Sequence, residues 1–188
     1  MFLCDASITE KIKSGEISID PFNPENVQPA SYDLTLGNEF LAFDKTQQIC
    51  IDVKEPVSNA MKKVKIKDDE SYILHPAEFA LANVREMTYV NEQHVGWLMG
   101  KSSLGRLGLI IHATAGFLDP GNKVNMTLEL SNVGSLPIKL YPGMKIAQIA
   151  FALLDKPCKK AYGNKELGSK YYGDRKVKES LMYKNFKE

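Results

Sequence analysis

The segment VNMTLELS, residues 124–131, decides the fold class, because its apolar and polar residues alternate along its whole length. This alternation is typical of a β-strand with one buried face. Leu128 and Leu130 then lie on the buried face, and Glu129 lies on the opposite face. A carboxylate in that position is either an ordinary solvated side chain, which is the common case, or a positioned general base.

Similar segments lie on both sides of this strand. Further strands are predicted at 31–36, 79–84, 108–113, 137–141 and 146–153. Gly and Pro residues predict turns between them, at 119–121, 134–135 and 142–143. A short helix is expected near the start, where Ser7 and Glu10 can form a capping box and Gly15 can end the helix. The pattern therefore predicts a mainly β sandwich or barrel.

The composition indicates a single domain over residues 1–188. The chain is 44% hydrophobic, and no Pro/Ser-rich stretch divides it. Apolar periodicity fades from about residue 163, so residues 163–188 are predicted as a flexible tail and a candidate lid. The 24 basic and 23 acidic residues nearly cancel, which argues against a nucleic-acid partner.

Other sequence features bear on where the protein acts. No apolar run approaches the roughly 20 residues of a membrane span, and the start lacks the pattern of a cleavable leader. The 3 cysteines are far apart in the sequence and indicate no disulfide framework. A cytoplasmic protein with no membrane partner is expected.

The segment GKSSLGRLGL, residues 100–109, combines cations, hydroxyls and closely approachable backbone N–H groups. This combination suits phosphate oxygens. Its GKS resembles a Walker A loop, but that motif requires a glycine where Val95 stands. A polar turn with an incidental basic pair is the alternative that the segment alone leaves open.

Four ordered motifs resemble those of the dCTP deaminases of the dUTPase superfamily. They are GKSSLGRLGL at 100–109, HATAGFLDPG at 112–121, MTLELSN at 126–132 and LYPGMKIAQIAF at 140–151. PASYDLTLG at 29–37 and the AYG and GSKYYGD segments between 161 and 174 extend the resemblance over most of the chain. The form Ala115-Gly116-Phe117 and the glutamine Gln148 most resemble the bifunctional, dUMP-forming branch.

This resemblance implies a fold and an activity. The fold is a dUTPase-like distorted, jelly-roll-like β-barrel with a short N-terminal helix and a C-terminal lid, assembled as a homotrimer with active sites between subunits. The activity is deamination of dCTP and hydrolysis of the resulting dUTP to dUMP and pyrophosphate, which supplies dUMP for thymidylate synthesis. Mg²⁺ would enter with the triphosphate, and dTTP would be an inhibitor. The alternatives are a monofunctional deaminase that releases dUTP, a plain dUTPase and a non-catalytic dNTP-binding regulator.

The motifs also imply roles for particular residues. Glu129 would shuttle protons, while Ser102 and Arg106 would hold the water, the base edge and the developing charge. The residues implied to bind substrate are Lys101, Ser103, Ala115, Asp119, Gln148, Tyr162 and Lys170. Ala115 would help to fix the water through its backbone, and Asp119 would meet the sugar 3′-OH. Asp33 is either a metal-linked carboxylate or a hydrogen-bond partner at a strand end.

Zinc is the usual activator of water in nucleobase deaminases, held by H-x-E and P-C-x-x-C elements. None of His75, His94 and His112 has a glutamate two residues on, and no two cysteines are close. A deaminase built from this chain is therefore expected to work without zinc. Positioned proton transfer by one carboxylate is worth roughly 10² to 10⁴ in rate.

Three positions depart from the family pattern. Residues 121–124 read GNKV where a second glycine is usual, which puts the local turn in doubt. Asp174 replaces a phosphate-contacting glutamine and would repel a triphosphate unless it is paired or turned away. Lys101 replaces an arginine, which exchanges a bidentate fork for a point charge. Elsewhere, Trp97 is expected in the core and His112 as a packing residue at a strand end.

Overall fold

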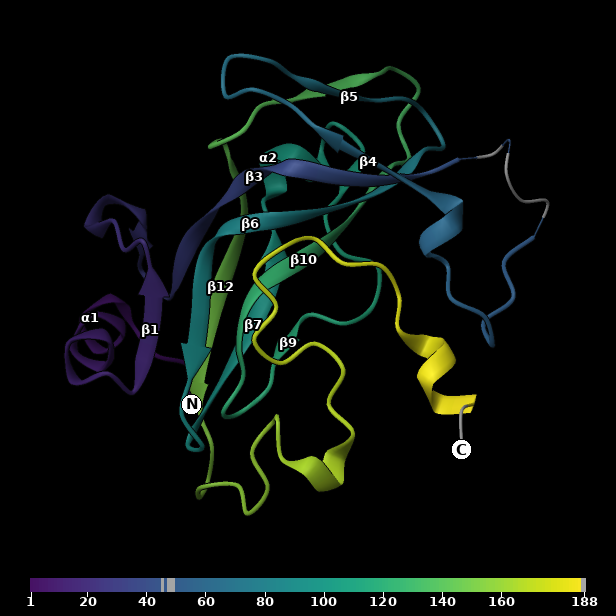
Figure 1. The fold of residues 1–188 in the computed structure, drawn as a ribbon. Coiled ribbons are helices and arrows are strands. Elements are labelled where there is room, and N and C mark those ends of the chain that lie inside the picture. Colours follow the sequence, from purple (N-terminus) through teal and green to yellow (C-terminus); the bar gives the residue numbers. More distant parts are fainter. Residues whose placement is uncertain (45, 47–49, 187–188) are drawn as a thin grey trace.

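The computed structural model describes residues 1–44, 46 and 50–186, which form a ten-stranded sheet and a two-stranded sheet (Figure 1). The large sheet contains β1 (Ile17–Asp20), β2 (Val27–Gln28), β3 (Ser31–Phe43), β4 (Met61–Lys65), β6 (Phe79–Val90), β7 (His94–Gly100), β8 (Leu109–Ile110), β9 (Phe117–Leu118), β10 (Lys123–Asn132) and β12 (Lys145–Leu153). The small sheet pairs β5 (Tyr72–Leu74) with β11 (Ile138–Leu140). The helices are α1 (Asp5–Ser14), α2 (Ser102–Gly105) and the 3₁₀ turns Pro24–Asn26, Ser58–Ala60, Lys165–Leu167 and Met182–Phe186.

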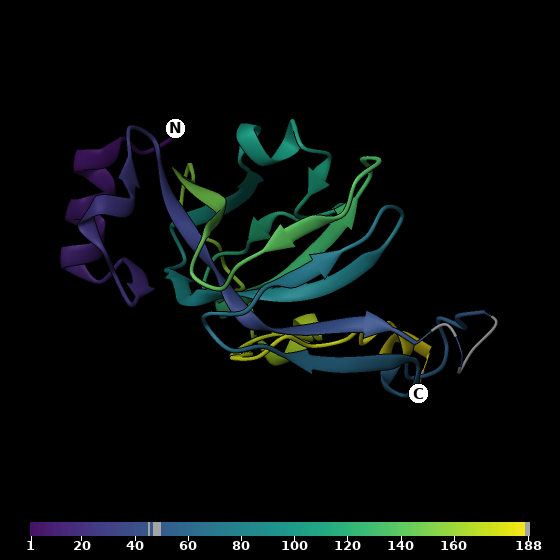
Figure 2. The same cartoon turned by 90° about the horizontal axis from the view of Figure 1, so that it is seen from above.

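The large sheet curls into a half-barrel, as Figure 2 shows from above. Its main order is β8-β10-β6-β3-β12-β7-β9, and β1, β2 and β4 pair beside this path. Every pairing between the described strands is antiparallel. The mainly β fold expected from the sequence is confirmed.

The long strand β3 joins the two walls of the curl. Its first half pairs with β12, and its second half pairs with β4 and β6. The register against β6 shifts between Leu36 and Phe40, next to Gly37. A Cβ on Gly37 would lie 2.8 Å from the backbone oxygen of Asn83. Only a residue without a side chain allows the two strands to approach so closely at this bend.

The core lies inside the curl and follows the alternation of the sequence. On β10, Leu128 and Leu130 are fully buried and Glu129 is half-buried on the opposite face. The strands predicted at 31–36 and 79–84 are present but extend to residues 43 and 90. The predicted strand at 108–113 is reduced to residues 109 and 110, because the chain then turns away as a loop.

The N-terminal helix is present, but the predicted capping box is wrong. The helix begins at Asp5 after the cap residue Cys4, so Ser7 lies inside it and caps nothing. The acidic Asp5 in the first turn accepts the N–H of Ala6 at 2.8 Å and suits the positive end of the helix dipole. The predicted end is correct, because Gly15 adopts φ 77° there and donates its N–H to the Ile12 carbonyl.

Trp97 is not a core residue, contrary to expectation, and its side chain is 46% exposed. It lies on β7 between Gly96 and Leu98, whose side of the strand faces the core. On the outer side its ring lies 5.5 Å from Phe117 and 6.4 Å from Phe2, measured between ring centroids. The three form an exposed aromatic cluster.

The C-terminal tail runs beside β10 (Figure 1). Gly173 donates its N–H to the Lys123 carbonyl at 2.9 Å, and the Asp174 carbonyl accepts the N–H of Asn125 at 2.9 Å. Val177 is buried against Leu41 and Leu81. The tail therefore packs on its own barrel in this structure, while its movement as a lid stays a prediction.

Candidate active site

Glu129 is anchored at the centre of the candidate site. Its Oε2 accepts the backbone N–H of Ala113 at 2.7 Å, and its own N–H donates to the Ile111 carbonyl at 2.9 Å. These two bonds tie the loop at 111–116 to β10, so the loop and the carboxylate hold each other in place. A carboxylate bound on one oxygen keeps acceptor capacity on the other.

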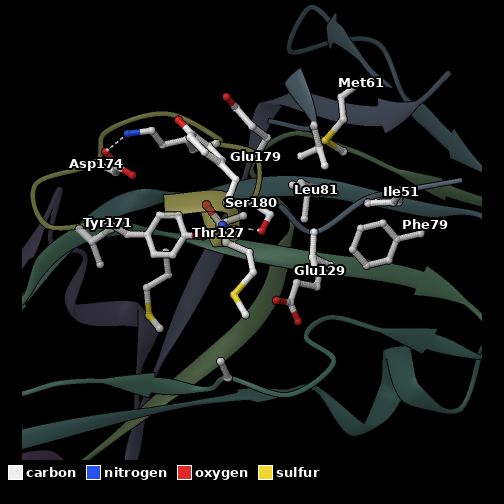
Figure 3. A pocket seen from close by; sticks show the side chains of 18 of the residues that line it. Ile51, Met61, Phe79, Leu81, Thr127, Glu129, Tyr171, Asp174, Glu179 and Ser180 are labelled. Carbon is white, nitrogen blue, oxygen red and sulfur yellow. Dashed lines mark hydrogen bonds and ion pairs between the residues drawn. The ribbon is translucent and has the colours of Figure 1, made fainter. Parts of the chain in front are cut away.

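Glu129 points into a cavity of about 650 Å³ (Figure 3). Ala115, Asp119 and Tyr162 also line this cavity. These four residues, which the motifs assign to one site, therefore line the same cavity. The first and the last of them, Ala115 and Tyr162, are 47 positions apart in the sequence. The remaining wall is largely apolar and includes Ile51, Met61, Phe79 and Leu81.

Asp119 begins a tight turn that sets the edge of this cavity. Asn122 donates its N–H to the Asp119 carbonyl at 2.9 Å, and Gly121 between them has φ 82°. Pro120 followed by a glycine with positive φ is typical of a type II turn. The doubt about residues 121–124 is thus resolved, because Gly121 alone closes the turn. Burial raises the pKa of Asp119.

Tyr162 lies next to this turn and donates its backbone N–H to the Pro120 carbonyl at 2.8 Å. Burial raises the pKa of its phenol, and the charge of Asp119 raises it further. The phenol therefore stays protonated at neutral pH and can donate a hydrogen bond to a ligand. Lys170 lines an adjoining cavity of about 310 Å³ together with Asp119 and Tyr162.

A second cavity of about 480 Å³ contains the phosphate-suited segment. Lys101, Ser102, Ser103 and Gln148 line it, as does His112. Gln148 is held from both ends: its Nε2 donates to the Gly100 carbonyl and its Oε1 accepts the Ser31 hydroxyl, both at 3.4 Å. The hydroxyls of Ser102 and Ser103 are exposed on the short helix α2.

Asp33 is paired with two lysines. Its Oδ1 lies 2.5 Å from the ammonium of Lys101, and its Oδ2 lies 3.2 Å from that of Lys145. Its side chain is only 3% exposed. Both oxygens are thus paired with lysines within the protein.

Within one chain, the predicted residues fall into two groups. Glu129, Ala115, Asp119 and Tyr162 line the larger cavity, and the 101–103 segment and Gln148 line the other. Arg106 is exposed and lines neither cavity.

Asp174 forms an ion pair, which reduces the repulsion that its carboxylate would exert on a triphosphate. Its Oδ1 lies 3.0 Å from the ammonium of Lys178. Sequence reasoning missed the part that its neighbours play, because Tyr171, Glu179 and Ser180 also form a wall of the larger cavity (Figure 3). The only signal in the sequence was the pair of tyrosines inside GSKYYGD.

Residues 1–44, 46 and 50–186 are the part of the chain that the structure describes. In that part of the chain, no group of three or more His, Cys, Asp or Glu side chains is placed to hold a metal ion. The same residues include no helix that is both long and apolar enough to span a membrane.

Comparison with known proteins places these features in a wider context. The profile of the dCTP deaminase-like family matches residues 2–154. The "dCTP deaminase, dUMP-forming" of Corynebacterium jeikeium (strain K411) is 47% identical over 186 residues, covering 99% of both chains. The protein of the same name from Clavibacter michiganensis subsp. michiganensis (strain NCPPB 382) is 44% identical over 186 residues, covering 99% of this chain and 92% of its own.

A solved structure supports the fold. The 2′-deoxycytidine 5′-triphosphate deaminase from Agrobacterium tumefaciens superposes with a TM-score of 0.65 at 20% sequence identity. The match covers 81% of this chain and 48% of that one, so the present chain spans about half the length of that protein. At this identity the likeness concerns the backbone fold alone.

Proposed function

The chain belongs to the dCTP deaminase-like family, and on this basis we propose that it converts dCTP to dUMP in two hydrolytic steps. The first step replaces the 4-amino group of cytosine by oxygen from water and releases ammonia. The second uses another water to cleave dUTP into dUMP and pyrophosphate. Relatives of the dUMP-forming class, matched over 99% of this chain, support the two-step reaction over deamination alone.

The observation that carries the proposal is the placement of Glu129. Its carboxylate is half-buried, held by the Ala113 N–H and directed into a cavity large enough for a pyrimidine nucleoside. We assign to it the removal of a proton from the attacking water and the delivery of protons to ring N3 and to the leaving amine. One carboxylate can perform these transfers in turn, because each proton taken from the water neutralises it and each proton delivered to N3 or to the amine restores its negative charge.

The neighbouring residues fit the sugar, the phosphates and the first water. Asp119 lies in the same cavity and would accept a hydrogen bond from the 3′-OH of deoxyribose. Tyr162 and Lys170 adjoin Asp119 and would contact the phosphates. The backbone at Ala115 lies in the loop that Glu129 anchors, so it would help to position the first water.

The other cavity would hold the triphosphate and the base edge. Lys101, Ser102, Ser103 and Gln148 supply one cation, two hydroxyls and an amide there. Arg106 is exposed beside them and would reach the developing charge from outside the cavity of its own chain.

We propose that the two groups of residues meet across a subunit boundary in a homotrimer. The separation of Glu129 from Ser102 into different cavities supports this, because neither cavity alone contains a complete set. The exposed cluster of Phe2, Trp97 and Phe117 also supports it, since Phe117 lies on the wall of the larger cavity. A neighbouring subunit that covers the cluster would lie next to Glu129.

Magnesium is proposed to enter with the nucleotide. Triphosphate oxygens are hard ligands that hold Mg²⁺ well, and the metal would neutralise charge on the leaving pyrophosphate. Asp33 does not fit as a direct ligand in this structure, because both its oxygens bind lysines. Since dTTP has the same sugar and triphosphate, we propose it as a competing inhibitor.

Product analysis tests the two-step reaction. Purified protein is incubated with dCTP and Mg²⁺, and ammonia, dUTP, dUMP and pyrophosphate are measured over time. Equal amounts of ammonia, dUMP and pyrophosphate are expected. Accumulation of dUTP without pyrophosphate would show a deaminase that stops after one step, and dUTP cleavage without any ammonia from dCTP would show a plain dUTPase.

Mixing two inactive variants tests the composite site. Glu129→Gln and Ser102→Ala are each unfolded, mixed in equal amounts and refolded together. If the two residues act across a boundary, random assembly restores about one quarter of the sites. If both act from one chain, every site contains a defect and the mixture stays inactive. Wild-type protein refolded by the same procedure is the control.

A further inference from the structure

The pair of lysines on Asp33 is the feature that the proposed function leaves unexplained. The carboxylate is on β3, Lys101 immediately precedes α2, and Lys145 begins β12. One lysine is sufficient to neutralise one carboxylate, so the second gives the group of three a net charge of about +1. The arrangement therefore offers more positive charge than the fold itself requires.

The two lysines differ in what they can reach. Lys101 is 23% exposed and lines the cavity of about 480 Å³, next to the serine hydroxyls of α2. Lys145 is 44% exposed but is not part of that cavity's wall. Only Lys101 is placed to contact a ligand in the cavity, and yet in this structure its ammonium is bound to Asp33.

Moving Lys101 from Asp33 to a phosphate would remove a counter-ion from the buried Asp33 carboxylate. Asp33 is 3% exposed, so water cannot take the place of a lost cation, and an unpaired buried carboxylate is strongly unfavourable. Lys145 removes the problem, because its ammonium stays on Oδ2 when Lys101 leaves Oδ1. The same buried carboxylate can then exist with one lysine or with two.

The neighbouring positions on β3 cannot supply the positive charge that Asp33 needs when Lys101 leaves. The Ser31 hydroxyl binds Gln148, and Thr35 donates both its N–H and its hydroxyl to the buried Glu86. These side chains on either side of Asp33 are therefore engaged with uncharged or anionic partners. Within the part of the chain that the structure describes, Lys101 and Lys145 are the cations paired with Asp33.

We propose that Lys145 is the counter-charge that frees Lys101 to bind the phosphates of the nucleotide. This inference rests on the proposed function and adds a positioning residue to it. Lys145 touches no substrate atom and acts through Asp33 on Lys101. Nucleotide binding then exchanges one ion pair of Asp33 for a contact between Lys101 and phosphate, with the buried carboxylate paired throughout.

Binding measurements on Lys145→Met test the idea, because methionine keeps the apolar stem and removes the charge. The probe is α,β-imido-dUTP with Mg²⁺, titrated by calorimetry. With Lys145 absent, Asp33 retains Lys101, so the Kd is expected to rise about tenfold or more. KM for dCTP should rise in parallel while kcat changes little. Lys139→Met, an exposed lysine on β11, is the matched control and should bind as the wild type does.

A double variant separates positioning from direct contact. Adding Asp33→Asn to Lys145→Met removes the competitor for Lys101 without leaving a buried charge, so binding should recover toward the wild-type Kd. A double variant as weak as Lys145→Met would overturn the proposal, because it would show that Lys145 contacts phosphate itself.

Two further outcomes are distinguishable. Lys145→Met that binds within twofold of the wild type would overturn the proposal alone. Wild-type protein that neither binds the analogue nor releases ammonia from dCTP would overturn the proposed function and this inference with it. Recovery in the double variant also shows that the weak binding of Lys145→Met does not come from misfolding.

Discussion

Replacing Glu129 by glutamine separates the chemical role of this side chain from its structural one. In the structure, Oε2 accepts the Ala113 N–H at 2.7 Å, and a glutamine oxygen can accept the same bond. A bond to a charged acceptor contributes about 1.5–3 kcal/mol and a neutral one about 0.5–1.5 kcal/mol, so the substitution should lower the free energy of unfolding by only about 1 kcal/mol.

The effect on turnover should be much larger. An amide cannot take a proton from water, so ammonia release should fall by roughly 10² to 10⁴, which corresponds to about 2.7–5.4 kcal/mol in the activation free energy. The increase in the activation free energy is then at least twice the decrease in the free energy of unfolding. This difference is the quantity that identifies a general base.

The assay combines three measurements on the same two proteins. Ammonia release from dCTP gives kcat, titration with α,β-imido-dUTP gives the Kd, and urea unfolding gives stability. We expect kcat to collapse, while the Kd stays near that of the wild type and unfolding changes slightly. If Glu129→Gln turns over dCTP at the wild-type rate, the assignment of Glu129 as proton shuttle is wrong.

Three other perturbations test separate parts of the structure. Burial lowers the pKa of His94, so below about pH 6.5 the unfolded state takes up a proton that the folded state does not, and the free energy of unfolding falls as the pH drops. The urea midpoint should therefore drop between pH 7.5 and 5.5 more steeply in the wild type than in His94→Gln, and equal slopes would contradict this. Tyr171→Phe removes the hydroxyl that accepts the Leu181 N–H at 3.0 Å, which should weaken the tail by about 1 kcal/mol and speed hydrogen exchange at Leu181; unchanged exchange would refute the bond's role. Activity should survive a zinc-specific chelator, disappear with EDTA and return with Mg²⁺, whereas recovery with zinc alone would argue against the proposed chemistry.

Much of the fold was predictable because burial imposes a period of two on a strand. Leu128 and Leu130 on one side and Glu129 on the other follow directly from that rule. The rule says little about where strands end or pair. It therefore missed the extension of β3 to Phe43, which depends on a bend at Gly37 against a strand about fifty residues away in sequence.

The site was predictable only as a set of residues and not as an arrangement. The motifs named Lys101 and Ser102 beside Glu129, but one chain places them in different cavities. The ion pair between Asp33 and Lys145 joins two adjacent strands of the sheet. The two residues are 112 positions apart in the sequence. A local pattern contains no information on such a contact, because antiparallel pairing between distant strands sets it.

Trp97 lies outside the core because the alternation of sides along β7 overrides the hydrophobicity of its side chain. Gly96 and Leu98 occupy the inner side of β7, so the residue between them must point outward whatever its hydrophobicity. The same parity explains why Phe117, its neighbour at 5.5 Å, is also exposed.

That outward indole gives the protein a built-in optical probe. The chain has 1 tryptophan, so its emission under selective excitation reports on a single place. An indole in contact with water emits at longer wavelength than one in an apolar setting. If neighbouring molecules pack over this ring, dilution that separates them would accordingly shift the emission to longer wavelength. The measurement needs no added label.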